Sequence, residues 1–217
     1  MTTATYQTDV SDMLIPHNML RSVLGSAEAI VEGVQREDRD HRAAVTSYFD
    51  NVLRFLDAHH GGEDACIWPL LGERCPTAAE LLDRMGDEHE AIHASRERAG
   101  AALVQWSASG DAASELVSTL NDLRSRVEQH FREEETEILP LASANMSPEE
   151  WAALPGHAMA HFAGDKIWLI LGLVLEQMTD EQRAFTLSLL PPPAVEMWTT
   201  MGNAAFDEFI AEVRSTA

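Results

Sequence analysis

Two histidine–glutamate pairs with the same spacing are the residues of this sequence best suited to chemistry. His59 and Glu63 stand four residues apart, His130 and Glu134 repeat that spacing, and a proline follows ten residues after each histidine. Four residues turn a helix by about 40° and climb about 6 Å, so each pair can present two donor groups to one site.

Both pairs lie on apolar stripes of helical period, which places them on buried helix faces. The stripes are Phe49, Val52, Leu56, Cys66 and Leu70 around the first pair, and Leu116, Leu120, Leu123, Val127, Ile138 and Leu141 around the second. Imidazoles and ionised carboxylates inside a core cost several kcal/mol unless they are paired or bind a metal. The pattern therefore predicts a buried metal site.

Further histidines enlarge the donor set. His89 and His93 are again four residues apart, and His17 lies alone on an apolar face near the N-terminus. Imidazole and carboxylate without thiolate suit iron, manganese or zinc. About seven donors exceed the four of a structural zinc site, so two metals are expected, about 3.5 to 4 Å apart and bridged by the two glutamates.

The elements that must position these donors are all predicted to be helices. Helical periodicity and capping signals indicate helices over residues 12–35, 41–74, 77–107, 157–178 and 194–213, with shorter helices starting at 147 and 179. A further helix follows the turn at residues 109–111 and ends at about 146. Gly61 and Gly62 predict a kink or loosening within the second helix. No strand pattern is found, so the fold class is all-α.

These motifs resemble the hemerythrin-like HHE cation-binding domain. The resemblance covers about residues 12–145 and rests on His17 with Arg21, His59-His60-x2-Glu63-Asp64, Glu88-His89, and His130-Phe131-x2-Glu134-Glu135 with Pro140. It implies an antiparallel four-helix bundle over 12–146 that holds two non-haem irons, joined by an oxo or hydroxo group and two carboxylates. Residues 147–217 would be an added helical extension that packs on the bundle.

The same resemblance implies which residues are ligands. The positions that match are His17, His59, Glu63, His89, His130 and Glu134, and His93 matches the second histidine of the third helix in oxygen-carrying members. Oxygen carriers place their last carboxylate five residues after the histidine, which here is Glu135. Iron-sensing relatives use a four-residue step, and the apolar stripe also favours Glu134.

His60 and Asp64 also stand four residues apart, rotated by about 100° from the first pair. We interpret them as a solvent-facing or supporting pair, in which the carboxylate could orient the imidazole of a ligand.

The C-terminal residues carry a further pair, His157 and His161. Two interpretations stay open: ordinary interface histidines on a helix that caps the bundle, or additional ligands that complete the metal centre, in place of His93 for example. Gly164 and Gly172 favour close approach of another helix. Trp198 with Met197 and Met201 predicts a hydrophobic contact, either within the chain or across a homodimer, so the oligomeric state stays open between monomer and dimer.

Composition excludes several classes of function. The net charge is −21 with Lys166 as the single lysine, which disfavours nucleic acid and anionic membrane surfaces as partners. Cys66 and Cys75 form no CxxC pair and are expected to be free thiols in a reducing compartment. Residues 1–10 show neither a basic patch nor an apolar run, so we expect no signal peptide and a cytoplasmic protein.

A di-iron centre predicts binding or reductive handling of dioxygen, nitric oxide or hydrogen peroxide. The enzymatic version is detoxification of peroxide or nitric oxide. The alternatives are an iron- or oxygen-responsive regulatory protein without turnover, and a zinc- or manganese-stabilised interaction module.

Overall fold

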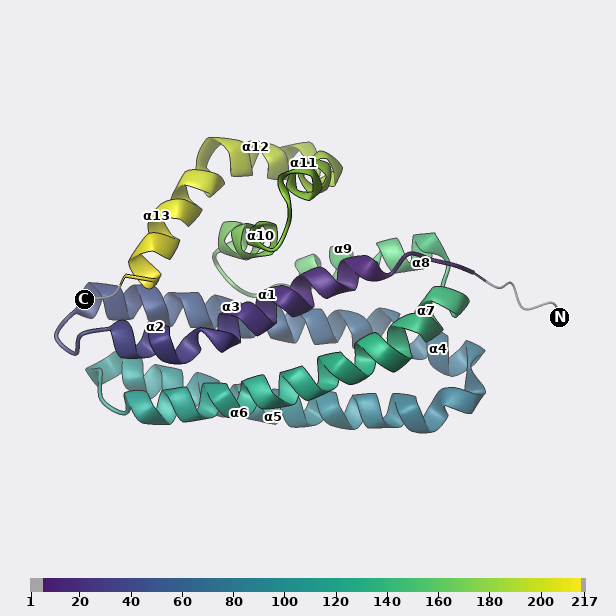
Figure 1. The fold of residues 1–217 in the computed structure, drawn as a ribbon, viewed down its shortest axis with the longest axis horizontal. Coiled ribbons are helices and arrows are strands. Elements are labelled where there is room, and N and C mark those ends of the chain that lie inside the picture. The colour runs from purple at the N-terminus through teal and green to yellow at the C-terminus, as the bar shows by residue number, and fades with distance from the viewer. Residues whose placement is uncertain (1–5, 216–217) are drawn as a thin grey trace.

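The protein is an antiparallel bundle of four long helical rods with a smaller helical extension on one side (Figure 1). The computed structural model describes residues 6–215, and all regular elements within that range are helical, which confirms the predicted fold class. Residues 1–5, part of the segment expected to lack a signal peptide, lie outside the described range. Among residues 6–215, none of the helices combines the length and the apolar character that a membrane-spanning helix needs.

Each rod of the bundle is made from one or more consecutive helices. The rods are η1 Ser11–Met13, α1 Leu14–Gly25 and α2 Ala27–Gly33; α3 Arg39–Cys66 and α4 Trp68–Arg74; η2 Pro76–Ala78 and α5 Ala79–Ser109; and α6 Ala113–Glu133, the π-helical turn η3 Glu134–Ile138 and α7 Leu139–Asn145. Short connections between the rods make sequential neighbours antiparallel. The chain turns at Gly110, whose φ of 73° suits glycine.

The predicted loosening at Gly61 and Gly62 is not observed. α3 continues through both glycines to Cys66, and the rod breaks at Ile67, two residues before Pro69. The reason is local: the proline lies at the start of α4, where its missing N–H is tolerated. Gly62 instead allows α9 to pack closely on α3, because a Cβ at Gly62 would lie 3.3 Å from Leu154.

The extension contains α8 Pro148–Ala152, α9 Leu154–His161, α10 Ile167–Glu176, α11 Asp180–Leu189, α12 Pro192–Met197, the π-helical turn η4 Trp198–Gly202 and α13 Asn203–Val213. The predicted single helix over 157–178 is therefore wrong: it is two helices joined by residues 162–166. Asn51 of α3 fixes this joint, because its amide donates to Asp165 and its carbonyl oxygen accepts from the backbone N–H of Lys166.

One face of the extension packs on the bundle while the rest stands away from it. α9 packs along α3, α10 contacts α1 and α3, and α13 contacts α3 and α10. Gly172 of α10 allows a close approach, since a Cβ there would lie 2.2 Å from the ring of Phe206 in α13. α11 and α12 lie farthest from the bundle in Figure 1.

Two apolar clusters fill the interior. The larger runs through the middle of the bundle and into the extension, and the smaller lies at the end where α4, α7 and α8 meet. Along the rods, the buried histidines and glutamates lie between these two apolar clusters.

Candidate metal centre

Seven buried donor side chains come together from four rods of the bundle. Three come from α3: His59, His60 and Glu63. The other four are His17 from α1, His89 from α5, His130 from α6 and Glu134 from η3. Each is at most 7 % exposed. Because long rods in register carry them, the donors face one another in the middle of the bundle.

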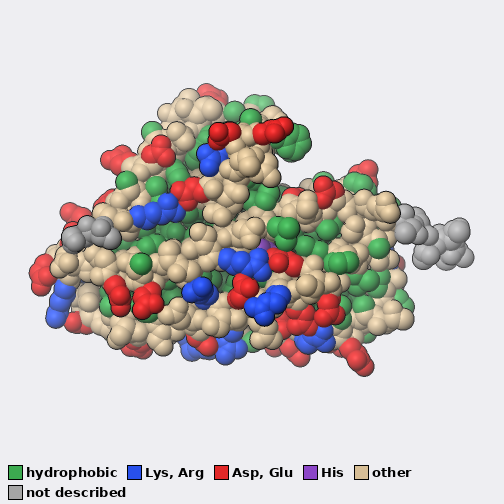
Figure 2. Space-filling view, in the orientation of Figure 1, with side chains coloured by type: hydrophobic (Ala, Val, Ile, Leu, Met, Phe, Trp, Pro, Cys, Tyr) green, Lys and Arg blue, Asp and Glu red, His purple; other side chains and the backbone are tan. Residues whose placement is uncertain are grey.

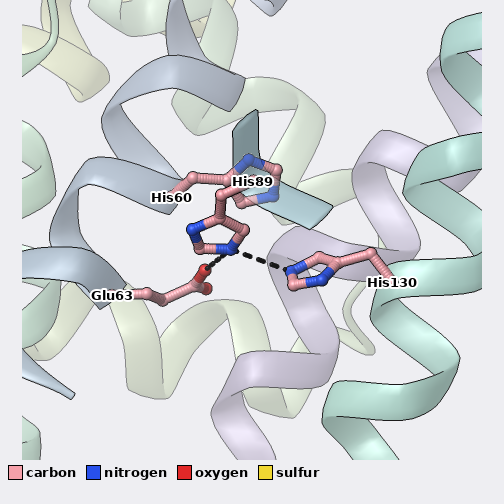
Figure 3. A group of neighbouring side chains, drawn as sticks. All are labelled: His60, Glu63, His89 and His130. Atoms are coloured by element: carbon pink, nitrogen blue, oxygen red, sulfur yellow. Dashed lines mark hydrogen bonds and ion pairs between the residues drawn. The ribbon is translucent and has the colours of Figure 1, made fainter. Parts of the chain in front are cut away.

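Glu63 lies at the centre of the group. One of its oxygens is 3.1 Å from His59 Nε2, and the other is 3.3 Å from His89 Nε2. Figure 3 shows Glu63 and His60 with His89, whose Nε2 also lies 3.0 Å from His130 Nε2.

Glu134 lies near two further histidines. Its Oε2 is 3.2 Å from His17 Nε2 and 3.8 Å from His130 Nε2. This carboxylate therefore links the α1 and α6 histidines, as Glu63 links those of α3 and α5.

The donor atoms form two overlapping groups of metal-site size. The first contains His60, Glu63, His89 and His130, and the second contains His17, His59 and Glu63. Within each group the ligand atoms lie within 4.8 Å of one another. Glu63 belongs to both groups, so one carboxylate can serve two neighbouring cations.

The hydrogen bonding of the cluster is incomplete without a cation. Seven buried atoms of the cluster have no hydrogen-bond partner among the described residues: Nε2 of His17, His59 and His60, and both carboxylate oxygens of Glu63 and Glu134. Each such group costs about 1 to 3 kcal/mol, and more if it is charged. Lone pairs of imidazole and carboxylate aimed at one another suit a metal, so the residues fit the metal centre predicted from the sequence.

Carboxylates outside the cluster orient three of the imidazoles. Nδ1 of His17 donates to Glu135 at 2.8 Å, Nδ1 of His89 to Asp64 at 2.7 Å, and Nδ1 of His130 to Glu88 at 3.0 Å. With Nδ1 protonated, each ring directs the lone pair of Nε2 into the bundle. Arg21 and Trp68 hold two of these carboxylates in turn, by donating to Glu135 and Asp64 respectively.

The π-helical turn at Glu134–Ile138 separates the roles of two consecutive glutamates. Glu134 points inward and is fully buried, whereas Glu135 accepts from Nδ1 of His17 at the edge of the bundle. A π turn adds one residue to a helical repeat and is frequent at functional sites. Of the two carboxylates left open by the sequence, the structure thus places Glu134 among the donors and Glu135 behind a histidine.

The surroundings shift the acidity of several of these groups. Burial opposes protonation of His17, but Glu134 and Glu135 outweigh it and raise its pKa to about 9. Burial likewise opposes protonation of His89, and Asp64 and Glu63 raise its pKa to about 9. The pKa of His59 is lowered well below the usual value by burial and by the neighbouring histidines. Burial and the charge of Glu134 raise the pKa of Glu63.

Three histidines predicted as ligands lie elsewhere. The ring of His93 is 62 % exposed and lies 3.7 Å from Asp57, because Ile92 takes the inward position at this level of α5. The structure therefore does not bring His93 into the cluster.

His157 and His161 lie on α9, which packs on the outer side of α3. Their rings stack on each other at 4.2 Å, and His161 is exposed. Because α3 stands between α9 and the donors, the structure does not bring this pair to the cluster either, and the suggestion that it completes the metal shell finds no support in the geometry.

His60, in contrast, was not predicted as a ligand but lies among the donors. It is 7 % exposed, its ring stacks on that of His89 at 4.3 Å, and its Nε2 is one of the unpartnered donors. It was expected to face solvent or only to support a ligand. Periodicity missed it because His59 and His60 both point inward where α3 passes between two neighbouring rods. Asp64 does orient a donor imidazole, as expected.

The fold and the site together define a helical-bundle protein with a buried histidine–carboxylate centre of the cation-binding kind. The family model described as the hemerythrin HHE cation binding domain matches residues 8–142, more than half of the chain and all seven donors. The chain belongs to this family. No curated protein and no solved structure matches it.

Proposed function

We propose that the chain holds two non-haem irons between the four rods and uses them to bind or reduce a small ligand: dioxygen, nitric oxide or hydrogen peroxide. The observation that carries the proposal is the pair of overlapping donor groups that share Glu63. Seven buried donors are too many for one tetrahedral zinc, and a shared carboxylate is how two adjacent cations are held.

The chain's own residues would have three tasks in this function. His17, His59, His60, His89 and His130 would supply neutral imidazoles, and Glu63 and Glu134 would supply negative charge that balances the cations. Asp64, Glu88 and Glu135 would fix the rings. Phe131 stacks on His17 at 3.8 Å and, with other apolar neighbours, would exclude water. Bound iron would supply the redox chemistry, which side chains alone lack.

Metal analysis with the absorption spectrum of the purified protein tests the proposal. We expect about two irons per chain and iron-dependent absorption in the near ultraviolet, both lost in Glu63→Ala and kept in the surface variant His93→Ala. One zinc or manganese per chain, with no iron uptake under anaerobic ferrous loading, would refute the di-iron centre and favour the metal-stabilised interaction module.

Turnover separates an enzyme from a binder. Iron-loaded protein that decomposes hydrogen peroxide faster than the same amount of free iron would be an enzyme. Reversible spectral change with oxygen or nitric oxide, without consumption of reductant, would favour a carrier or a sensor.

A further inference from the structure

The outer faces of α3 and α5 form a long groove that lies apart from the metal centre. Its volume is about 980 Å³, and its floor consists largely of small and apolar side chains: Ala43, Ser47, Leu53, Gly100, Ala101, Leu103 and Val104. Small residues facing each other on two helices leave room that no other part of the described chain fills. From Arg39 to Arg54, α3 rises about 22 Å at 1.5 Å per residue, enough for a short helix.

The groove is basic in a very acidic protein. Four of the fourteen arginines line it, Arg39, Arg42, Arg54 and Arg96, against two acids, Asp50 and Glu97. Arg54 pairs with Asp50, Arg96 pairs with Asp57, and Arg42 donates to the carbonyl groups of Arg36 and Ser107. The lining therefore keeps an excess of positive charge although the whole chain carries −21.

The extension carries a helix of complementary character. Within the described chain, no residue of α11 is buried, and Phe185 and Leu189 are 64 % and 68 % exposed. They stand four residues apart, so they form one apolar ridge. Glu181 continues this ridge toward the acidic first turn, and residues 147–217 contain ten acidic and three basic residues.

The three large apolar side chains that are more than 60 % exposed in the described chain are Phe185 and Leu189 on α11 and Val104 in the groove. α11 is not among the elements lining the groove of its own chain, because α10 and α13 hold the extension against α1 and α3. Figure 2 shows hydrophobic side chains at the end of the extension that stands away from the bundle.

We propose that α11 of one chain docks in the α3–α5 groove of a second copy, which makes the protein a reciprocal homodimer. The ridge of Phe185 and Leu189 covers Val104 and Leu53, and the acidic start of α11 faces the arginines. A helix in a groove is a recurrent mode of recognition, and two-fold symmetry produces the contact twice. The proposal does not depend on the metal centre.

Sedimentation velocity of the full chain over a wide concentration range tests the association. We expect wild type to approach twice the 24.0 kDa mass of the chain. Phe185→Glu/Leu189→Glu on α11 and Arg39→Glu/Val104→Glu in the groove should each give monomer with unchanged helical circular dichroism. Matched controls are Met201→Glu, an exposed apolar residue outside α11, and Arg132→Glu, an exposed arginine on α6. Both should stay dimeric.

A mixed disulfide tests which surfaces meet. Val104→Cys chains mixed with Phe185→Cys chains under oxidising conditions should give a covalent dimer at a several-fold higher yield than either variant alone. A wild type that stays monomeric at every concentration, a dimer dissociated by Met201→Glu but not by Phe185→Glu/Leu189→Glu, or the absence of the mixed disulfide would each overturn the proposal.

Discussion

At the scale of single residues, Glu63 shows how a donor can destabilise the protein that carries it. Both of its oxygens are buried without hydrogen bonds, and burial together with the charge of Glu134 raises its pKa. Burial of this carboxylate opposes folding, the protonated His89 ring at 3.3 Å offsets part of that cost, and a metal cation would offset more of it.

Replacement of this glutamate by glutamine should separate stability from metal binding. We expect Glu63→Gln to raise the melting temperature of the metal-free protein by several degrees and to lower metal affinity at least 10-fold to 100-fold. Thermal unfolding with and without ferrous iron measures both effects. Glu137→Gln, at an exposed glutamate of the π-helical turn η3, is the control and should change neither. A metal-free Glu63→Gln protein that melts below wild type would contradict this account.

The support that Asp64 gives to His89 predicts an effect on the metal from outside the cluster. One oxygen of Asp64 accepts from both His89 Nδ1 and Trp68 Nε1. Asp64→Asn should no longer hold the proton of His89 on Nδ1, so Nε2 is less available to a metal, and metal affinity should fall about 10-fold to 100-fold. Because the Trp68 ring lies 5.5 Å from that of His89, a metal bound at His89 should quench the fluorescence of Trp68, and this quenching measures metal affinity in a titration. Asp87→Asn, at an exposed acid on α5, should leave affinity unchanged; equal affinity in both variants would remove the role assigned to Asp64.

Two raised histidine pKa values predict how metal binding depends on pH. His17 and His89 have pKa values of about 9 in the metal-free protein, so both are protonated at neutral pH. The charged rings contribute stability that is fully present below about 6.5 and is lost as the pH rises through about 9. A metal must displace these protons, so its affinity should rise from pH 6.5 to 9 and level off above.

Calorimetry in buffers of different ionisation enthalpy counts the protons released by metal binding at neutral pH. We expect about two in wild type and the same number in His93→Ala, because that exposed ring lies outside the cluster. Release of no protons would show that the two rings are neutral before the metal arrives.

At the scale of helices, Gly61 and Gly62 form a matched pair. A Cβ at Gly61 would meet nothing within 4 Å, whereas one at Gly62 would lie 3.3 Å from Leu154 and 3.6 Å from Ala158 of α9. Gly61→Ala should raise the free energy of unfolding by about 1 kcal/mol through helix propensity alone. Gly62→Ala should gain less, since the new methyl group presses on α9. Urea unfolding of both variants measures the two free energies of unfolding. Equal increases in the two variants would mean that α9 does not pack against Gly62.

The helices were easier to predict than their joints. The helices predicted to start at 147 and 179 do start there with capping boxes, Ser147–Glu150 and Thr179–Gln182, because each box is a local exchange of hydrogen bonds that a sequence pattern encodes. Thr77 with Glu80 has the same spacing but forms no box, since α5 begins after Ala78 without a side-chain cap. The joint at residues 162–166 depends on Asn51, more than a hundred residues earlier, and no local pattern reveals it.

The site shows the same limit. Residue spacing predicts six of the seven donors, since each of the six lies on an apolar stripe of its helix. It missed His60 and included His93, because which of two neighbouring positions points inward depends on how the rods are rotated about their axes.

At the scale of the whole molecule, the bundle and the extension are joined through apolar contacts of α10 and α13 with α1 and α3. Leu169, Ile170 and Leu173 of α10 are almost fully buried. Removal of the extension would leave the surfaces of α1 and α3 that they cover exposed to water, at a cost of about 25 cal/mol for each Å² of apolar area. The extension should therefore act on the stability of the bundle while the donors remain on the bundle itself.

A chain shortened to residues 1–146 tests this division. It keeps all seven donors and the region matched by the family model. We expect the shortened chain to bind the same number of metal ions as the full chain, with a lower melting temperature and a greater tendency to aggregate through the uncovered faces of α1 and α3. Metal content by mass spectrometry and the absorption spectrum compare the two chains. The control is full-length His157→Ala/His161→Ala, which should match wild type in metal content and spectrum. If the shortened chain is helical by circular dichroism but takes up less metal, or if the double variant loses an ion, then the extension contributes to the centre and the separation of roles is wrong.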